Sequence, residues 1–400
     1  MFNKKIKIEN DSVVFLFING PHHTHHLILP ALTFAHNYKQ YQTTLISGSD
    51  KNTEIIEQTL DKMGNPGCKI IKLPKPLRYH IKNYRNKIIP PPKSQWKSID
   101  KSILYSKAII STSHETPSFI KKNRSTAPKL FYVYHGTGTR SYGFENSIDK
   151  YDFIFIPGKY HFNRLQKETG IHKNKLSIVG HPKFEWQDMM DNNIISFFNN
   201  NNPIFFYNPH WDLSLSSYQK WSKRIIQYFQ DNKQYNLIFS PHPLIKNYSS
   251  RKKIDVNIDV AKSNNIIIDF YSNNNVDGSY INAADVYIGD VSSMVTDFIF
   301  KENKSCIFIN SYDIDWRNDK SFNFWNCGKV IDEFEELDSA ITSSLNQNKY
   351  INNQQNAYSY LSESINRFPN QKTVKSMLEK TGFTFLPSAY SSTKTFSLRR

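Results

Sequence analysis

The chain has 400 residues, 38% apolar and 14% aromatic, which is enough to bury the cores of two or three globular domains. Its 51 Lys and Arg residues outnumber 35 Asp and Glu residues, leaving a formal net charge of +16 and a pI near 9.4. That charge fits a nucleic acid, an anionic membrane surface or a phosphate-rich substrate as partner, although a composition rich in Asn, Ile and Lys accounts for part of it.

Membrane-spanning and disulfide-stabilised classes are disfavoured. No apolar run approaches the roughly 18 residues that a membrane span needs, and the run VVFLFING near the N-terminus lacks a signal-peptide cleavage pattern. The three cysteines, Cys68, Cys306 and Cys327, are odd in number and lack metal-ligand spacing, which argues against a disulfide framework and a zinc site. We therefore expect a cytoplasmic protein.

Short apolar runs of strand length alternate along the chain with segments of helical pattern. We expect strands at 13–18, 43–47, 69–73, 108–112, 129–134, 153–157, 176–180, 204–208, 236–240, 266–270, 285–288 and 305–309. This alternation predicts parallel sheets with helices on their faces. The last two strands enclose a predicted helix over 294–300, so they form one strand, helix, strand unit.

The Asn-rich segment 188–203 has the low complexity of a linker between two such sheets. We therefore predict an α/β protein with two Rossmann-like domains facing a cleft. The N-terminal domain covers 1–190 and the C-terminal domain covers 191–384. Residues 385–400 form a polar, basic tail.

A basic segment over 69–101 mixes Lys and Arg with Ile, Leu, Tyr and Trp. Such a mixture suits an anionic membrane surface or another polyanion. The segment also carries five prolines and has no clean helical period, so an irregular surface loop explains it equally well.

Polar residues follow five of the predicted strands, at the edge where open α/β sheets bind ligands. They are His135, Gly136, Thr137 and Arg140; His181 and Lys183; Asn208 and His210; His242; and Asp290, Ser292 and Ser293. A single histidine in such a place is usually an ordinary hydrogen-bonded residue. The joint placement of these residues predicts a binding site.

The turn before the predicted helix 294–300 is unusually polar. One Ser or Asp suffices to cap a helix, yet this turn carries Asp290, Ser292 and Ser293, with Asp297 one turn further on. A helix N-terminus is also an anion site. Together with a histidine and two basic residues from other strand ends, the turn is suited to a diphosphate, and a nucleotide-linked donor fits best.

Other ligand classes lack support in the sequence. There is no G-x-x-x-x-G-K-[ST] motif and no G-x-G-x-x-G motif, which disfavours a P-loop NTPase and a dinucleotide oxidoreductase. Asp313 and Asp315 form only a short D-x-D match to a metal site. The first strand is followed by five histidines without a neighbouring Cys or carboxylate to complete a tetrahedral set; they are His22, His23, His25, His26 and His36. We expect no metal and no cofactor, and we expect this histidine-rich loop to touch an acceptor.

The motifs YHGTGTRSYG, GHPKFE, YNPHWD, SPHP and GDVSSMVTDF occur in this order between about residues 130 and 300. Together they resemble the CDP-glycerol glycerophosphotransferases of teichoic-acid and capsule synthesis. The resemblance implies a two-domain GT-B fold with an N-terminal acceptor side and a C-terminal donor side. It also implies a peripheral enzyme at the inner face of the cell membrane, which moves glycerol phosphate from CDP-glycerol to a hydroxyl acceptor.

The resemblance also implies roles for particular residues. His135 of the H-G-T motif looks like the histidine that activates the acceptor, and His242 of the H-P motif looks like the histidine that contacts the donor phosphates. The implied donor contacts come from Gly136, Thr137, Arg140, Lys183, Asn208, Asp290, Ser292, Ser293 and Asp297. Lys183 stands where the family usually has arginine, Arg140 stands where it has lysine, and His210 and Asp212 flank Trp211 in place of the family's P-T-W-R.

The implied partners are CDP-glycerol or a related cytidine nucleotide, a polyol-phosphate, lipid-linked or oligosaccharide acceptor, and an anionic membrane surface, without nucleic acid. Two alternatives stay open. A CMP-sugar glycosyltransferase, similar to the GT-B sialyltransferases, also pairs an H-P with an S-S motif but leaves H-G-T unexplained. A non-catalytic scaffold that binds polyanions or membranes would suit the net charge but leaves the polar strand ends unexplained.

Overall fold

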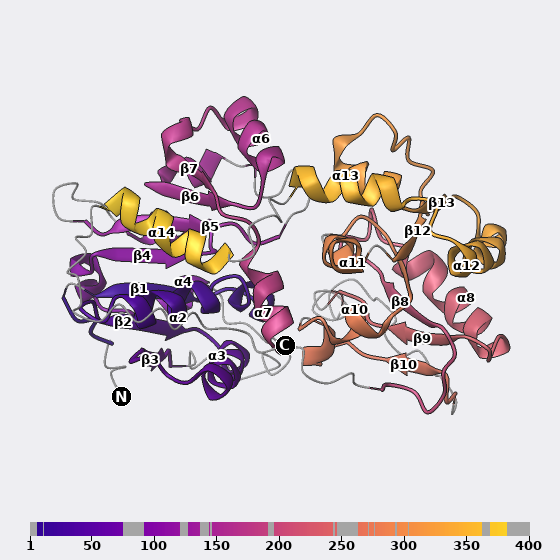
Figure 1. The fold of residues 1–400 in the computed structure, drawn as a ribbon, viewed down its shortest axis with the longest axis horizontal. Coiled ribbons are helices and arrows are strands. Elements are labelled where there is room, and N and C mark those ends of the chain that lie inside the picture. Colours follow the sequence, from indigo (N-terminus) through magenta and orange to yellow (C-terminus); the bar gives the residue numbers. More distant parts are fainter. Residues whose placement is uncertain are drawn as a thin grey trace. The chain divides into compact units, whose positions relative to one another are not determined.

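The computed structural model shows a chain that divides into two compact α/β units (Figure 1). Unit 1 comprises Met1–His135, Phe144–Asn192 and Ile365–Arg400, and unit 2 comprises Gly136–Gly143 and Asn193–Ser364. The structure describes residues 6–10, 12–74, 92–120, 127–136, 144, 146–190, 196–242, 245, 263–270, 272–275, 277–292, 294–302, 304–361 and 369–381.

Unit 1 is built on a parallel sheet of seven strands in the order β3-β2-β1-β4-β5-β6-β7. The strands are β1 (Val13–Phe17), β2 (Thr43–Ser47), β3 (Lys69–Lys72), β4 (Ala108–Ser111), β5 (Lys129–Val133), β6 (Phe153–Ile156) and β7 (Leu176–Ile178). The central strands are buried on both faces because helices cover the sheet on each side, which is why they are nearly continuous apolar runs.

The helices of unit 1 are α1 (Pro21–Thr24), α2 (Ile28–Asn37), α3 (Asp50–Met63), α4 (Pro92–Trp96), α5 (Thr116–Phe119), α6 (Lys159–Thr169), α7 (Pro182–Met190) and α14 (Pro369–Thr381). Local sequence sets the ends of α3: the Ser49 side chain accepts a hydrogen bond from the Asn52 amide, and Gly64 ends the helix with φ +80°. The indole of Trp186 in α7 donates to the Thr59 hydroxyl in α3 at 2.9 Å.

Unit 2 is built on a parallel sheet of six strands in the order β10-β9-β8-β11-β12-β13. The strands are β8 (Ile204–Asn208), β9 (Asn236–Phe239), β10 (Ile266–Ile268), β11 (Val286–Gly289), β12 (Ser305–Ile309) and β13 (Lys329–Ile331). Strand β11 lies between β8 and β12, with Gly289 paired in register with Asn208 and with Phe308. The chain therefore reverses its direction of strand addition between β10 and β11, which is the kind of point where doubly wound sheets bind ligands.

The helices of unit 2 are α8 (Tyr218–Asp231), α10 (Ser279–Ala283), α11 (Met294–Glu302), α12 (Leu337–Asn346) and α13 (Ile351–Leu361). Helix α8 is amphipathic, and it buries Trp221, Ile225 and Phe229 against the sheet at helical spacing. Short 3-10 helices complete the two units: η3 (Lys101–Tyr105), η4 (Asn146–Lys150), η5 (Lys173–Lys175), η6 (Asn273–Asn275), η7 (Lys320–Cys327) and η8 (Phe334–Glu336).

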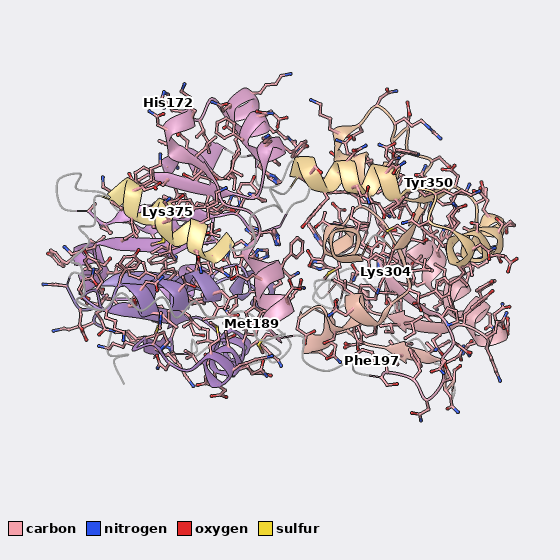
Figure 2. All side chains as sticks on the ribbon, viewed as in Figure 1. His172, Met189, Phe197, Lys304, Tyr350 and Lys375 are labelled. Atoms are coloured by element: carbon pink, nitrogen blue, oxygen red, sulfur yellow. The ribbon has the colours of Figure 1, made fainter. Side chains whose placement is uncertain are left out.

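Side chains fill the layers of each unit (Figure 2). Met189 of α7 packs against the core of unit 1, and the Phe197 ring lies 5.0 Å from that of Tyr280 in unit 2. Among the described residues, no helix is long and apolar enough to span a membrane.

All twelve predicted strands are present, and the predicted helix over 294–300 is helix α11. One strand, β13, was not predicted. It has three residues, begins with a lysine and lies at the sheet edge, so it lacks the apolar signal of the others.

The C-terminal helix differs from the predicted division of the chain. The sequence-based division placed residues 191–384 together, but α14 packs on α2 and α7 in unit 1, where Val374 and Met377 enter the core. Residues 385–400, expected to form a basic tail, lie outside the described residues.

Candidate active site

Polar side chains gather at the carboxyl edge of the unit 1 sheet. Strands β1, β4 and β5 are neighbours there, so Asn19, Thr112 and His135, which follow these strands, end close together. The amide of Asn19 donates to the Thr112 carbonyl at 3.2 Å. His23, in the short helix α1, joins them through its Nδ1, which lies 3.2 Å from the Thr112 hydroxyl.

His135 is half-buried, and its imidazole is held on two sides. The ring of His23 packs against it with centroids 3.8 Å apart. On the other side the hydroxyl of Tyr132 lies 3.2 Å from Nδ1 of His135 and 2.7 Å from Nε2 of His114. Tyr132 thus bridges two histidines that follow neighbouring strands.

Burial lowers the pKa of His135 well below its usual value, and nearby His114 and His22 lower this pKa further, while a hydrogen bond to the Thr112 carbonyl raises it. The imidazole is therefore neutral at neutral pH. A neutral, half-buried imidazole at the ligand-binding edge of a sheet is able to accept a proton from a hydroxyl group.

A second group of histidines surrounds Lys183 in unit 1. Lys183 lies in the first turn of α7, where its side chain is 6% exposed. Burial, together with the nearby Lys183 charge, lowers the pKa of His22 to about 4 and that of His181 to about 3. Burial and then the Lys183 charge also lower the pKa of His25 well below its usual value, and the His25 ring packs on that of Trp186 at 4.0 Å. These imidazoles are neutral, so Lys183 carries the positive charge of the group.

The histidine-rich loop contacts both groups, and within it the rings of His22 and His23 lie 4.4 Å apart. His23 packs on His135, whereas the ring of His26 lies 4.7 Å from that of His181. In the described part of the chain, no group of three or more His, Cys, Asp or Glu side chains is arranged to hold a metal ion.

The second concentration of predicted site residues lies at the carboxyl edge of the unit 2 sheet. The Asn208 amide, at the end of β8, donates to the Ser240 carbonyl at 2.6 Å, which joins the ends of β8 and β9. The His242 amide donates to the Pro209 carbonyl at 3.1 Å, and the rings of His242 and His210 lie 6.2 Å apart.

The buried carboxyl group of Asp290 accepts hydrogen bonds from the loop at this edge. Its side chain is 0% exposed, and its Oδ2 accepts hydrogen bonds from the backbone amides of His210 at 2.8 Å and Ser217 at 3.0 Å. Burial raises the pKa of Asp290 to about 7, although these hydrogen bonds oppose the shift. The carboxyl therefore fixes the loop between β8 and α8 in place.

Ser292 caps helix α11, since its hydroxyl accepts a hydrogen bond from the Met294 amide at 3.1 Å. Asp297, in the first turn of this nine-residue helix, is buried. The N-terminus of α11 lies at the carboxyl edge of β11, next to β8, and a helix N-terminus favours an anion.

The predicted site residues are divided between the two units. His135 and Lys183 belong to unit 1, and Asn208, His242, Asp290, Ser292 and Asp297 belong to unit 2. Gly136 has φ +94°, a conformation that glycine adopts without strain, so the chain turns sharply directly after His135. Thr137, Arg140 and Ser293 lie outside the described residues.

The sequence did not single out Tyr132 or His114 as site residues. Tyr132 lies inside a strand and reads as one more apolar residue of the run KLFYVY. His114 does follow strand β4 in STSH, and the strand-end criterion applied to that strand would have found it.

Comparisons with known proteins support the fold. A profile of the ubiE/COQ5 methyltransferase family matches residues 345–395. The described part of that stretch consists of the end of α12 with α13 and α14, which belong to different units, and it includes no strand of either sheet. No curated protein matches the chain.

Solved structures match nearly the whole chain at low sequence identity. A structure of the wall teichoic acid polymerase TagF is 14% identical, with a TM-score of 0.58 over 95% of this chain and 92% of that one. A putative UDP-N-acetylglucosamine 2-epimerase from Listeria monocytogenes is 11% identical, with a TM-score of 0.58 over 96% and 100%. The glycotransferase of kitacinnamycin is 7% identical, with a TM-score of 0.56 over 94% and 100%. The chain thus has two Rossmann-like α/β domains of the GT-B type.

Proposed function

We propose that this protein is a transferase that moves glycerol phosphate, or a related polyol phosphate, from a CDP-polyol donor to a hydroxyl acceptor. The observation that carries the proposal is the neutral imidazole of His135, held by Tyr132 and His23 at the carboxyl edge of the unit 1 sheet. The motifs around His135, His242 and Ser292 resemble those of CDP-glycerol glycerophosphotransferases. We also propose that the product enters a cell-surface polymer of the teichoic-acid or capsule type.

His135 would act as the general base. The acceptor hydroxyl gives its proton to the imidazole as its oxygen attacks the β-phosphorus, the bond from that phosphorus to the bridging oxygen breaks, and CMP leaves with the electron pair. A neutral imidazole is the form that this step needs, and the lowered pKa keeps it neutral. Positioned general bases typically contribute about a hundredfold or more to the rate.

The donor would bind at unit 2. His242 and the N-terminus of α11, with its Ser292 hydroxyl, are suited to the negative charge that develops on the departing CMP. Asp290 holds the loop that carries His210, so it would support the donor site through this loop.

The comparisons support a donor of this class without identifying it. The TagF structures include one titled with a CDPG soak, at 14% identity and a TM-score of 0.60. One structure in the same fold group is of a UDP-GlcNAc 2-epimerase from Neisseria meningitidis bound to UDP-GlcNAc, at 11% identity and a TM-score of 0.59. The fold therefore accommodates several nucleotide-linked substrates, and a CMP-sugar glycosyltransferase is the second candidate because of the H-P and S-S motifs.

A donor panel tests the proposal. Purified protein is incubated with CDP-glycerol, CDP-ribitol, CMP-sialic acid and UDP-glucose, and release of CMP or UDP is followed with and without chelator. We expect CMP from a CDP-polyol, as slow hydrolysis if the acceptor is missing, and little effect of chelator. Turnover of CMP-sialic acid alone would replace the proposal with the glycosyltransferase. Failure to bind any cytidine nucleotide would favour the non-catalytic scaffold.

A further inference from the structure

The hydroxyl of Tyr132 lies between two imidazole nitrogens, at 2.7 Å from Nε2 of His114 and 3.2 Å from Nδ1 of His135. A tyrosine hydroxyl has one proton to donate, so it donates to one of these nitrogens and accepts from the other. The direction of this short chain of hydrogen bonds decides which nitrogen of His135 carries its proton.

We propose that His114 and Tyr132 are positioning residues that keep the proton of His135 on Nδ1 and so leave Nε2 as the basic nitrogen. In this arrangement Nδ1–H of His135 donates to the Tyr132 oxygen, and the Tyr132 hydroxyl donates to Nε2 of His114, whose own proton is then on Nδ1. The kinetic consequence rests on the proposed function, whereas the position of the proton does not.

The two distances favour this direction over its reverse. The distance from the Tyr132 hydroxyl to His114 is 2.7 Å, which is typical of a hydroxyl donating, and the distance to His135 is 3.2 Å, at the long end of the range for a ring N–H.

The surroundings of His135 keep its imidazole neutral, as the chain of hydrogen bonds requires. Burial and the proximity of His114 and His22 lower the pKa of His135. The pKa of His23, whose ring packs on that of His135 at 3.8 Å, is also well below its usual value, with burial as the largest cause. A neutral histidine donates through only one nitrogen.

Two substitutions at His114 separate a positioning role from a packing role. His114 is half-buried, so its replacement is compatible with folding. In His114→Phe the Tyr132 hydroxyl loses its acceptor and is free to donate to Nδ1 of His135, which would move the His135 proton to Nε2. In His114→Gln the side-chain carbonyl is an acceptor again, and the proton should return to Nδ1.

The position of the proton is read directly by long-range proton–nitrogen correlation NMR on histidine-labelled protein, with the His135 signals identified by their loss in His135→Ala. We expect the Nδ1–H form in the wild type and in His114→Gln, and the Nε2–H form in His114→Phe. Tyr151→Phe is the matched control, because the Tyr151 hydroxyl donates to the Ser113 carbonyl in the same region. An Nε2–H form in the wild type, or a His135 signal that ignores His114→Phe, would overturn the inference.

A double-substitution cycle provides the second test. If His114 acts on His135 only through the Tyr132 hydroxyl, His114→Phe should no longer change the His135 proton once Tyr132 is Phe. In transfer assays His114→Phe should lower kcat about tenfold to a hundredfold with little change in donor KM, since part of the general-base contribution is lost. A His135 signal that still responds to His114→Phe in the Tyr132→Phe background would contradict the chain of hydrogen bonds.

The two proposals fail in different ways. If the NMR response is as expected but no donor in the panel is turned over, the inference about His135 stands and the proposed function falls. If a CDP-polyol is turned over but His114→Phe leaves the His135 proton on Nδ1, the proposed function stands and the inference falls.

Discussion

Asp290 gives unit 2 a pH-dependent stability. Burial raises the pKa of this carboxyl to about 7 from its usual 3.8, although Oδ2 accepts two backbone hydrogen bonds. The folded state therefore binds the Asp290 proton more tightly than the unfolded state does. The stabilisation from this proton is complete below about pH 4 and is lost as the pH rises through about 7.

The replacement Asp290→Asn removes this pH dependence while keeping an oxygen that accepts both amides. From the two pKa values, protonation favours the folded wild type by a factor of about 11 at pH 6 and about 1.1 at pH 8. This tenfold change corresponds to about 1.4 kcal/mol. The free energy of unfolding of the wild type, relative to that of Asp290→Asn, should therefore fall by about 1.4 kcal/mol between pH 6 and pH 8.

Urea denaturation of both proteins at the two pH values measures this difference. The buried histidines of unit 1 act in the opposite direction, because their lowered pKa values make the protein lose stability as the pH falls. They are present in both proteins, so they cancel in the comparison. Asp285→Asn is the control, since the exposed Asp285 carboxylate accepts the Ile204 amide at 2.8 Å in the same sheet. Parallel pH dependences of wild type and Asp290→Asn would refute the reasoning.

Further predictions concern the proposed chemistry. His135→Ala should lower transfer at least about a hundredfold while donor affinity is kept and Tm stays within about 4 °C of the wild type; a larger fall in Tm would indicate a structural histidine. Since the pKa of His135 is well below 6.5, the acid limb of kcat/KM should lie below that pH, and a limb at or above it would contradict the assignment of the base. Replacing Ser292 and Ser293 together by Ala should weaken CDP binding in calorimetry; unchanged affinity would leave capping as the role of this turn. The protein should bind anionic liposomes, and the binding should weaken as the salt concentration rises. Binding should also weaken when the charges of six basic residues are neutralised: Lys69, Lys72, Lys75, Arg78, Lys82 and Arg85. Undiminished binding by that variant would mean that another surface contacts the membrane.

Two of the lysines in the liposome prediction form ion pairs within the protein. Lys69 is paired with Glu9, and Lys72 is paired with Glu57 at 2.7 Å. Exposed pairs of this kind are worth about 1 kcal/mol or less, so both lysines can exchange these partners for lipid headgroups at small cost. Lys75, Arg78, Lys82 and Arg85 lie outside the described residues.

The strands could be predicted from the sequence because strands of a buried parallel sheet are short runs of apolar residues. The run that contains Tyr287 in β11 is an example. Strand β13 was not predicted, because only Ile331 of its three residues is buried. The packing of α14 on unit 1 was not predicted, because its contacts with α2 join residues more than 300 positions apart in the sequence. A local sequence pattern does not indicate such a contact.

The candidate site likewise has parts that local sequence predicts and parts that depend on contacts between distant residues. His135 and His242 were found because both follow strands, and topology alone puts strand ends at one edge of a sheet. The role of Asp290 was beyond the sequence, because its hydrogen-bond donors are 80 and 73 residues away along the chain. Tyr132 was missed because a buried tyrosine in a strand looks like core until its hydroxyl is seen between two histidines.

The return of α14 to unit 1 has a consequence for the order in which the protein folds. Val374 and Met377 enter the unit 1 core, and the Asn370 amide donates to Glu185 at 3.2 Å, yet the main segment of unit 2, Asn193–Ser364, is encoded between Glu185 and Asn370. On the ribosome, unit 1 therefore waits for its last helix while unit 2 is synthesised and is free to fold. Domains usually fold in order from the N-terminus, but here the folding of unit 1 would be completed after unit 2 has been synthesised. Until α14 packs on it, the apolar face of α2 is exposed, and we expect a chaperone to bind there.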